Sequence, residues 1–457
     1  MTRVPAPHDP PISLTIAGSD SGGGAGIQAD LKTMEANGCF GTSVVTSITA
    51  QNTLGVESSF VVPTEEIAAQ YEAVVSDFAV AAVKTGMLAE APVVDLVADR
   101  VRSLDVPLVV DPVMVAASGD RLLAPEAESA YERLVAEANV VTPNADEAEV
   151  LTGIEPTDPP SAIEAGRDLV DRGAGAALIK GGHIAGDTVV DTLVTPEEVT
   201  TYEHPRVSTD ATHGSGCTLS SAIAARLAYG DSLETAVASG IAFMERAVRY
   251  PLAVGTGPGA VHHLVGLRER ADRHPTAEAT ESVVRTLVEA DAARLVPEVG
   301  MNVVGATRYA EDPQEVAAVE GRVTRTMAGI RPNRGVRFGA SSHVARFLLT
   351  CREHDPALRF ATNCRFDDTV AAALEAVDWP AVAFDRSVEP AESREEEGGT
   401  MSFAARRAFE RADGTPAAVY DHGDVGKEPV VRVVAPDAGT LEARALDLLG
   451  AVREREE

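Results

Sequence analysis

The fold of the first half of the chain is decided by the stretch Ile16-Ala17-Gly18-Ser19-Asp20-Ser21-Gly22-Gly23-Gly24-Ala25-Gly26-Ile27-Gln28-Ala29-Asp30. It follows the first apolar run and precedes a segment with helical periodicity. Glycines at such a strand-to-helix turn let backbone amides approach a ligand closely. The stretch is not the GxxxxGKS/T phosphate-binding loop, and a GxGxxG dinucleotide motif lacks its acidic partner. Taken alone, it fits a structural turn equally well.

Outward from this turn, short β-branched runs alternate with alanine-rich helical segments from Ile12 to about Gly266. This alternation is typical of a doubly wound α/β domain, with a parallel sheet covered by helices. Its ligands are expected at the carboxyl ends of the strands. The predicted strands are Ser13–Ile16, Ser43–Ile48, Ala81–Thr85, Leu108–Val110, Val140–Thr142 and Ala176–Ile179, and the predicted helices include Glu65–Val75, Ala91–Leu104, Glu126–Ala136 and Ala162–Arg172.

A second glycine cluster, Thr212-His213-Gly214-Ser215-Gly216-Cys217-Thr218, precedes the small-residue helix Leu219–Leu227. Amides at a helix N-terminus predict an anion site that stabilises a phosphoryl group in transfer. The same position predicts a lowered pKa for the Cys217 thiol, which would accept the proton of an attacking hydroxyl. A lone cysteine is more often a buried filler. Its place in this loop favours the catalytic interpretation.

Charged side chains follow three of the predicted strands. Asp111 begins Asp111-Pro112-Val113-Met114, and Glu147 lies in Thr142-Pro143-Asn144-Ala145-Asp146-Glu147-Ala148. Carboxylates at adjacent strand ends suit Mg²⁺ beside a triphosphate. Each is alternatively a helix-capping or first-turn acid. Lys180, followed by Gly181 and Gly182, is predicted to neutralise phosphates.

Composition limits the function classes. The formal net charge is −31, so nucleic acid and anionic membranes are disfavoured partners, and we expect small-molecule substrates. The only lysines are Lys32, Lys84, Lys180 and Lys427. An acidic, lysine-poor surface indicates a high-salt cytoplasm in which ions screen the repulsion. Four scattered cysteines predict reduced thiols. With no secretory or transmembrane pattern, we expect a cytoplasmic protein.

Together these motifs resemble the hydroxymethylpyrimidine/phosphomethylpyrimidine kinases of thiamine biosynthesis, which have a ribokinase-like fold. The resemblance covers about 250 residues and implies two ATP-dependent phosphorylations, first of 4-amino-5-hydroxymethyl-2-methylpyrimidine and then of its monophosphate. A pyridoxal kinase of the same fold is the alternative. The motifs are AGSDSGGGAGIQADLKT (17–33), TAQNT (49–53), KTGML (84–88), DPVM (111–114), TPNADEA (142–148), IKGGH (179–183) and THGSGCT (212–218).

The resemblance also implies site residues, with ATP and Mg²⁺ as cofactors and a homodimer as the expected assembly. Substrate contacts fall on Gly18, Asp30, Gln51 and Met87, for which an amide and a carboxylate suit an aminopyrimidine. Metal contacts fall on Asp111 and Glu147. Phosphate contacts fall on Lys180, Thr212, Gly214, Ser215 and Gly216, and catalysis falls on Cys217 and Lys180.

The second half is expected to be a smaller α/β or α+β domain, residues 282–457, joined to a kinase domain of residues 1–265 by a polar linker, residues 266–281. Val283–Leu295 is predicted to be helical. The predicted strands are Asn302–Gly305, Gly335–Phe338, Ala381–Phe384 and Val430–Val434.

Several segments of this half resemble the thiamine-phosphate synthase domain that is fused to this kinase in many archaea, and with the acidic composition they indicate a haloarchaeal source. The segments lie at residues 320–325, 334–343, 397–401 and 420–429. The resemblance implies condensation of the pyrimidine diphosphate with thiazole phosphate, releasing pyrophosphate. Arg322 and His343 are the predicted catalytic pair and Lys427 a phosphate ligand. A non-catalytic thiamine-phosphate sensor and a structural module are the alternatives.

Overall fold

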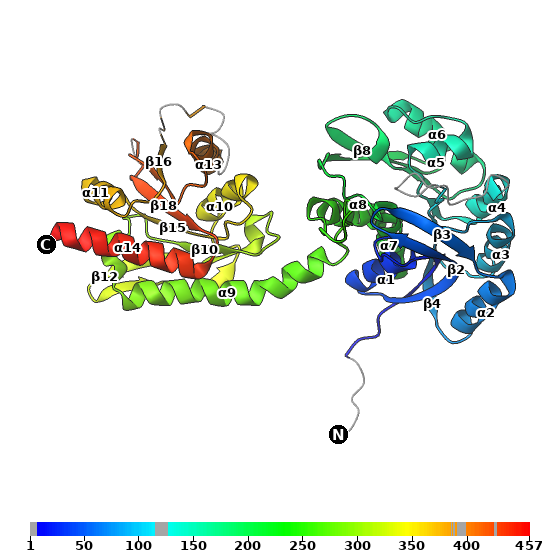
Figure 1. Cartoon of the computed structure of the whole chain (residues 1–457), viewed down its shortest axis with the longest axis horizontal. Helices are drawn as coiled ribbons and strands as arrows, with labels where there is room; N and C mark the ends of the chain where they lie inside the picture. The colour runs from blue at the N-terminus through cyan, green and yellow to red at the C-terminus, as the bar shows by residue number, and fades with distance from the viewer. Residues whose placement is uncertain (1–6, 115–126, 385, 387–388, 391–398, 425–426) are drawn as a thin grey trace, which may run out of the picture. The chain divides into compact units, whose positions relative to one another are not determined.

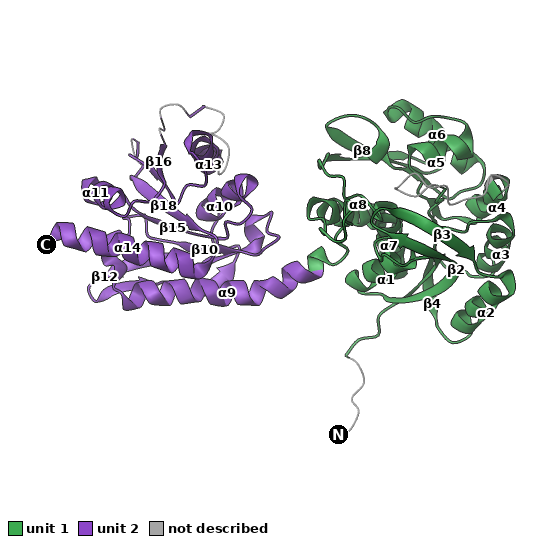
Figure 2. Cartoon of the chain, viewed as in Figure 1, with its two compact units in different colours: residues 1–266 green, residues 267–457 purple. Residues whose placement is uncertain are grey.

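The structure, a computed structural model, describes residues 7–114, 127–384, 386, 389–390, 399–424 and 427–457. It divides into two compact units, Met1–Gly266 and Leu267–Glu457 (Figure 2). Within the described residues, no helix is both long enough and apolar enough to cross a membrane.

The first unit, coloured from blue to green in Figure 1, is built on one nine-stranded sheet with the order β3-β2-β1-β4-β5-β6-β7-β8-β9. Neighbours from β2 to β7 are parallel, whereas β3 and the β8–β9 hairpin are antiparallel edges. The strands are β1 Ile12–Asp20, β2 Phe40–Asn52, β3 Gly55–Val61, β4 Val80–Thr85, β5 Leu108–Val110, β6 Val140–Val141, β7 Ala177–Ile179, β8 Thr188–Val194 and β9 Val199–Pro205.

Helices cover both faces of this sheet, which confirms the doubly wound prediction. Side chains from α2, α3, α4 and α6 pack on one face in a large apolar core, and those from α7 and α8 form a separate core. The helices are α1 Gly26–Ala36, α2 Thr64–Val75, α3 Ala91–Val101, α4 Glu128–Glu137, α5 Ala145–Thr152, α6 Pro159–Asp171, α7 Ser215–Ala228 and α8 Leu233–Arg249.

All six predicted strands of this unit are present, although β1 and β2 run further than expected. Strands β3, β8 and β9 were not predicted. β3 and β9 are edge strands with mostly exposed or half-buried residues, so they lack the continuous apolar run that marks a central parallel strand. The expected start of a helix at Glu126 lies outside the described residues.

The second unit contains a seven-stranded, mainly antiparallel sheet with the order β14-β11-β10-β15-β18-β17-β16. Helices α9, α11 and α14 pack on one face, and α10 and α13 on the other. The strands are β10 Val303–Ala306, β11 Val316–Val319, β14 Val336–Phe338, β15 Phe360–Arg365, β16 Ala381–Phe384, β17 Ala418–Asp421 and β18 Val430–Ala435, with a separate β12–β13 hairpin of Val323–Thr326 and Gly329–Pro332. The helices are α9 Val265–Glu289, α10 His343–His354, α11 Asp368–Ala376, α13 Gly399–Arg411 and α14 Ala438–Glu456.

The segment predicted as a linker, residues 266–281, is instead helical, and this corrects the prediction. It forms the first part of α9, Val265–Glu289, which continues through Pro275. Although the segment is polar, Asp272 accepts a hydrogen bond from Arg359 at 2.8 Å, and Thr276 and Thr280 are buried. Polar contacts within the second unit therefore hold this part of the helix, which lacks the apolar stripe by which a packed helix is predicted from sequence.

Candidate functional site

The two glycine clusters of the first unit lie against each other. A Cβ at Gly214, whose φ is +83°, would lie 1.8 Å from the carbonyl oxygen of Gly24. A Cβ at Gly26, whose φ is +56°, would lie 2.4 Å from the carbonyl oxygen of Gly18. Only glycine permits both the backbone conformation and the approach. The loop after β1 is thereby placed beside the N-terminus of α7.

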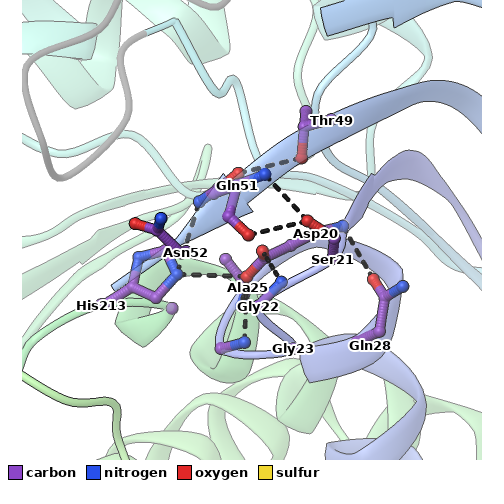
Figure 3. A network of polar contacts seen from close by, with 12 residues as sticks. Asp20, Ser21, Gly22, Gly23, Ala25, Gln28, Thr49, Gln51, Asn52 and His213 are labelled. Atoms are coloured by element: carbon purple, nitrogen blue, oxygen red, sulfur yellow. Dashed lines mark hydrogen bonds and ion pairs between the residues drawn. The ribbon is translucent and has the colours of Figure 1, made fainter. Parts of the chain in front are cut away.

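Asp20 holds the first loop in shape, as Figure 3 shows. Its carboxylate accepts hydrogen bonds from the amides of Gly22 (2.8 Å), Gly24 (2.9 Å) and Ala25 (2.7 Å), and its Oδ2 lies 3.2 Å from Nε2 of His213. Burial alone would raise the pKa of Asp20, but the contact with His213 and the amide bonds lower it. No role was predicted for Asp20 or His213. An aspartate preceding glycines is the usual start of such a turn.

Gln51 lies at the edge of this network. Its side-chain amide nitrogen is 3.5 Å from Nε2 of His213, and its Oε1 accepts a hydrogen bond from Thr49 at 3.2 Å (Figure 3). The side chain is half-buried at the end of β2. Gln51 is therefore positioned beside the glycine loops with partial access to solvent.

Gly18 and Met87, both predicted substrate contacts, are neighbours. A Cβ at Gly18 would lie 3.1 Å from the sulfur of Met87 and 2.6 Å from Oγ of Ser47. Met87 itself is 9% exposed. The structure therefore brings these two residues together beneath the first loop.

Asp30 differs from its prediction as a substrate contact, and this is a correction. Its Oδ1 accepts hydrogen bonds from Lys84 (2.9 Å) and Ser221 (2.8 Å), and its Oδ2 accepts one from Thr15 (2.6 Å). Asp30 and Lys84 are both 0% exposed. Because both carboxylate oxygens are engaged inside the protein, Asp30 is a buried structural charge that binds α1, β1, β4 and α7 together.

Lys180, Asp111 and Glu147 gather at the N-terminus of α7, as predicted. The Lys180 ammonium lies 3.2 Å from Oδ1 of Asp111 and 3.6 Å from Oε2 of Glu147. A Cβ at Gly216 would lie 3.3 Å from that ammonium and 3.6 Å from Oδ2 of Asp111. We call these four residues the phosphoryl cluster.

The remaining predicted phosphate ligands lie in the turn that begins α7. Gly214 is the N-cap residue, and the Ser215 amide donates to the Thr212 carbonyl at 3.0 Å. The amides of Gly216 and Cys217 belong to the first turn, where no preceding helical carbonyl is available to them. Ser220, which was not predicted, donates to Asp111 at 3.3 Å.

Glu147 has the helix-capping role that was considered for it. Its amide donates to the side chain of Asn144 and its carboxylate accepts from the Asn144 amide, each at 2.8 Å, which forms a capping box at α5. Burial raises the pKa of Glu147 and the negative charge of Asp111 adds to this, while Lys180 opposes both. The capping box fixes the carboxylate opposite Lys180.

The donor set fits a hydrated divalent cation. Asp111 and Glu147 supply two carboxylates, and in the part of the chain that the structure describes no three His, Cys, Asp or Glu side chains form a metal cluster. Mg²⁺ commonly keeps several waters and shares its remaining positions between one or two carboxylates and substrate phosphates. The pair therefore suits Mg²⁺ carried with a nucleotide rather than an all-protein cage.

Cys217 is in the predicted place, but the expected lowering of its thiol pKa is wrong. Burial raises the pKa of Cys217 to about 12, and the positive charge of Lys84 offsets only part of this. The N-terminus of a helix carries only a partial positive charge. It therefore stabilises the thiolate less than the loss of hydration on burial destabilises it. In this form of the protein Cys217 is a thiol.

In the second unit, the predicted catalytic pair is split. Arg322 follows β11 and His343 follows β14, and the antiparallel register pairs Val319 with Val336 and Ala317 with Phe338. The two exposed side chains therefore lie beyond opposite ends of this strand pair. This corrects the expectation that they act together within one chain.

Arg322 lies instead near the loop that carries Lys427. Arg322 donates a hydrogen bond to the carbonyl of Val299. The carboxylate of Glu428, the residue after Lys427, accepts hydrogen bonds from the amides of Glu298 (2.7 Å) and Val299 (3.0 Å). Arg322 and Lys427 both lie at the edge of the sheet that is formed by the end of β11 and the start of β18. We call this edge the Arg322 edge.

A buried charge cluster lies at the same edge. The Asp421 carboxylate accepts hydrogen bonds from Arg386 (2.8 and 3.1 Å) and Arg432 (3.1 Å), and all three residues are at most 8% exposed. Burial alone would raise the pKa of Asp421, but the two guanidinium groups lower it. Helix α13 begins at Gly399, within the predicted 397–401 motif, of which residues 397–398 lie outside the described part.

The sequence model of the phosphomethylpyrimidine kinase family matches residues 20–262, which hold the glycine loops and the phosphoryl cluster. The chain belongs to this family. A second model, that of the thiamine-phosphate synthase ThiN, matches residues 280–447.

Relatives in sequence agree with the first match. The hydroxymethylpyrimidine/phosphomethylpyrimidine kinase of Streptomyces coelicolor is 48% identical over 264 residues, which are 58% of this chain and 98% of the relative. The thiamine biosynthesis bifunctional protein ThiED of Geobacter sulfurreducens is 44% identical over 273 residues, 59% of this chain and 55% of that protein.

Solved structures similar to the first unit include a pyridoxal kinase from Bacillus subtilis in complex with ADP. It is 34% identical, with a TM-score of 0.53, and the match covers 56% of this chain and 98% of that one. The pyridoxal kinase of Staphylococcus aureus in complex with pyridoxal is 30% identical with the same TM-score, covering 57% and 96%. These matches establish the ribokinase-like fold of the first unit.

Proposed function

We propose that the chain is a bifunctional enzyme of thiamine biosynthesis. The first unit phosphorylates the hydroxymethyl group of the aminopyrimidine with ATP and then phosphorylates the monophosphate to the diphosphate. The second unit joins that diphosphate to thiazole phosphate, forming thiamine phosphate and pyrophosphate. The observation that supports the kinase half most strongly is the convergence of Lys180, Asp111 and Glu147 on Gly216 at the N-terminus of α7.

In the kinase reaction, the chain mainly positions groups and neutralises charge. Lys180 and the first-turn amides of α7 stabilise the negative charge that spreads over the transferring phosphoryl group. Gln51, Gly18 and Met87 line the acceptor side beside the glycine loops. Cys217, next in sequence to Gly216, offers its thiol to the attacking hydroxyl as a hydrogen-bonding partner. As the hydroxyl oxygen bonds to the γ-phosphorus, the bond from that phosphorus to the ADP oxygen breaks, and the hydroxyl proton passes to an oxygen of the transferred phosphoryl group.

Mg²⁺ is the expected metal. Asp111 and Glu147 would hold it through its water shell, and when bound it neutralises the nucleotide phosphates. The ionised form of Glu147 is favoured by Lys180, so the same ammonium that contacts phosphate also prepares the metal site.

For the second unit, the match to the thiamine-phosphate synthase model favours catalysis over a sensor or a scaffold. We place its phosphate site at the Arg322 edge, with Lys427 and the α13 N-terminus. The pyrophosphate leaving group requires positive charge nearby. The Arg322 edge supplies this charge, although the net charge of the protein is −31. The sensor interpretation predicts binding of thiamine phosphate without turnover.

The pyridoxal alternative has less support. Sequence relatives that carry the hydroxymethylpyrimidine/phosphomethylpyrimidine kinase name are 42–48% identical, against 30–34% for the pyridoxal kinase structures. Replacement of Gln51 distinguishes the two: Gln51→Ala should lower kcat/KM for the pyrimidine. Unchanged pyrimidine activity together with strong pyridoxal activity would favour the alternative.

A homodimer and a high-salt cytoplasm complete the proposal. Ile48 and Phe60 form a cross-strand pair between β2 and the edge strand β3, and they are 54% and 63% exposed. Exposed apolar pairs at a sheet edge favour self-association. Light scattering in high salt tests the dimer, and a monomer mass would contradict it.

The deciding experiment is product analysis in high salt with hydroxymethylpyrimidine, thiazole phosphate, ATP and Mg²⁺. The full chain is compared with residues 1–266. Thiamine phosphate from the full chain and only pyrimidine diphosphate from the fragment would support both halves. Pyrimidine diphosphate from both, with no thiamine phosphate, would reduce the second unit to a binding module.

A further inference from the structure

A pocket of about 250 Å³ lies beside the first glycine loop, and its lining residues include neither the phosphoryl cluster nor Gly18, Gln51 and Met87. Its walls are the backbone of residues 22–24, the imidazoles of His213 and His263, the side chain of Lys32, and an apolar side formed by Leu252, Val254 and Val261. Ligand pockets for drug-sized molecules are typically about 300–1,000 Å³. This one therefore fits a molecule smaller than a nucleotide.

Lys32 gives the pocket a positive charge. Its ammonium donates to the carbonyl of Gly23 at 2.6 Å, and within the described residues no carboxylate lies at ion-pair distance from it. Only four lysines occur in a chain with 70 acidic residues, and Lys84 and Lys180 are both paired. An exposed ammonium without a carboxylate partner beside a pocket is suited to an anion.

His263 supplies a buried polar group in the same wall. The residue is 3% exposed, and its Nε2 has no hydrogen-bond partner among the described residues. Burial lowers the pKa of His263 to about 4, and the nearby positive charge of Lys32 adds to this. The imidazole is neutral near pH 7, so an unpaired ring nitrogen remains for a polar atom of a ligand.

We propose that this pocket is a second small-molecule site, which holds a phosphorylated heterocycle with its phosphate on Lys32 and its ring against Leu252, Val254 and Val261. This rests on the proposed function, which supplies such a molecule: the pyrimidine monophosphate is the product of the first step and the substrate of the second. Between the steps the pyrimidine must be repositioned. In the first step its hydroxyl group faces the phosphoryl cluster, and in the second step the phosphate that was added to this hydroxyl must face it instead. His213, which contacts the pocket, Asp20 and Gln51, links the two sites.

The test measures binding by titration calorimetry on the full chain without ATP, so that no turnover occurs. The probes are the pyrimidine monophosphate, thiazole phosphate, unphosphorylated hydroxymethylpyrimidine and inorganic phosphate. Lys32→Gln should weaken binding of the monophosphate at least tenfold and change that of the unphosphorylated pyrimidine less than twofold. Val254→Trp, which fills the pocket from a position that is 47% exposed, should weaken the monophosphate similarly.

Arg102→Gln is the matched control, because it removes one positive charge from an exposed ion pair of the same unit. It should leave every affinity within twofold. Unchanged monophosphate binding in Lys32→Gln, an equal loss for the unphosphorylated pyrimidine, or inorganic phosphate binding as tightly as the ester would overturn the proposal. If thiazole phosphate bound in a Lys32-dependent way but the chain phosphorylated no pyrimidine, the second site would be supported and the proposed function would be refuted.

Discussion

Asp30 and Lys84 show at the residue scale how burial changes the meaning of a motif. Their ion pair is 2.9 Å long and fully buried. Burial alone would lower the pKa of Lys84, but Asp30 and the neighbouring acidic groups raise it, so the ammonium stays charged. Removing one partner leaves an uncompensated charge in the core.

Asp30→Asn should therefore reduce the free energy of unfolding by about 3–5 kcal/mol. Glu72→Gln, which breaks the exposed Arg100–Glu72 pair, should cost less than about 1 kcal/mol. Urea denaturation in high salt measures both. If Asp30→Asn were as mild as the control and instead selectively raised KM for the pyrimidine, the residue would be a substrate contact after all.

The pKa of Cys217 leads to a pH-dependent prediction. Because burial raises the thiol pKa to about 12, the thiolate fraction of the ligand-free protein should keep increasing above pH 9. The rate of iodoacetamide labelling at Cys217 should follow it, with Cys217→Ala as the blank for the three buried cysteines. A labelling midpoint near pH 7 would show that the pKa of the Cys217 thiol is lowered after all.

Cys217→Ala should also abolish phosphoryl transfer while ATP still binds, and near-normal turnover would remove Cys217 from the mechanism.

At the scale of elements, the contact between the β1–α1 loop and the N-terminus of α7 determines the site. Gly214 and Gly230 flank the same helix and share a φ of +83°, but a Cβ at Gly214 would strike the Gly24 carbonyl whereas a Cβ at Gly230 would meet nothing within 4 Å. Substitutions at the two positions therefore distinguish the effect of backbone strain from the effect of disturbing the contact between the loops.

Both Gly214→Ala and Gly230→Ala should lose about 1 kcal/mol of stability from the left-handed conformation. Only Gly214→Ala should also lose kinase activity, by on the order of a hundredfold, because the loops are forced apart by about an ångström or more. Steady-state kinetics on both variants checks this. Equal activity in the two would mean that the loop contact does not position catalytic groups.

At the scale of the whole molecule, the excess of acidic residues governs stability. With a net charge of −31, self-repulsion opposes folding, and the Debye length falls from about 10 Å at 0.1 M to about 3 Å at 1 M salt. Exposed ion pairs such as Arg100–Glu72 weaken over the same range but contribute little individually.

The urea midpoint of the full chain should therefore rise as KCl increases from about 0.1 M to about 2 M, because screening relieves the repulsion. An equal concentration of an uncharged osmolyte controls for general solvent effects. A midpoint that falls with KCl, or responds equally to the osmolyte, would show that charge repulsion is not the governing term.

The sequence by itself determined the doubly wound sheet, its six central strands and the approach of Lys180, Asp111 and Glu147, because buried parallel strands have local apolar runs and their carboxyl ends meet at one edge. It did not reveal the edge strands, the helical form of residues 266–281, the roles of Asp20 and His213, or the separation of Arg322 from His343. Those depend on contacts between residues far apart in the chain. Whether Asp30 faces a ligand, and whether Cys217 ionises, was decided only by the tertiary structure, since desolvation and register are properties of the packed molecule rather than of any motif.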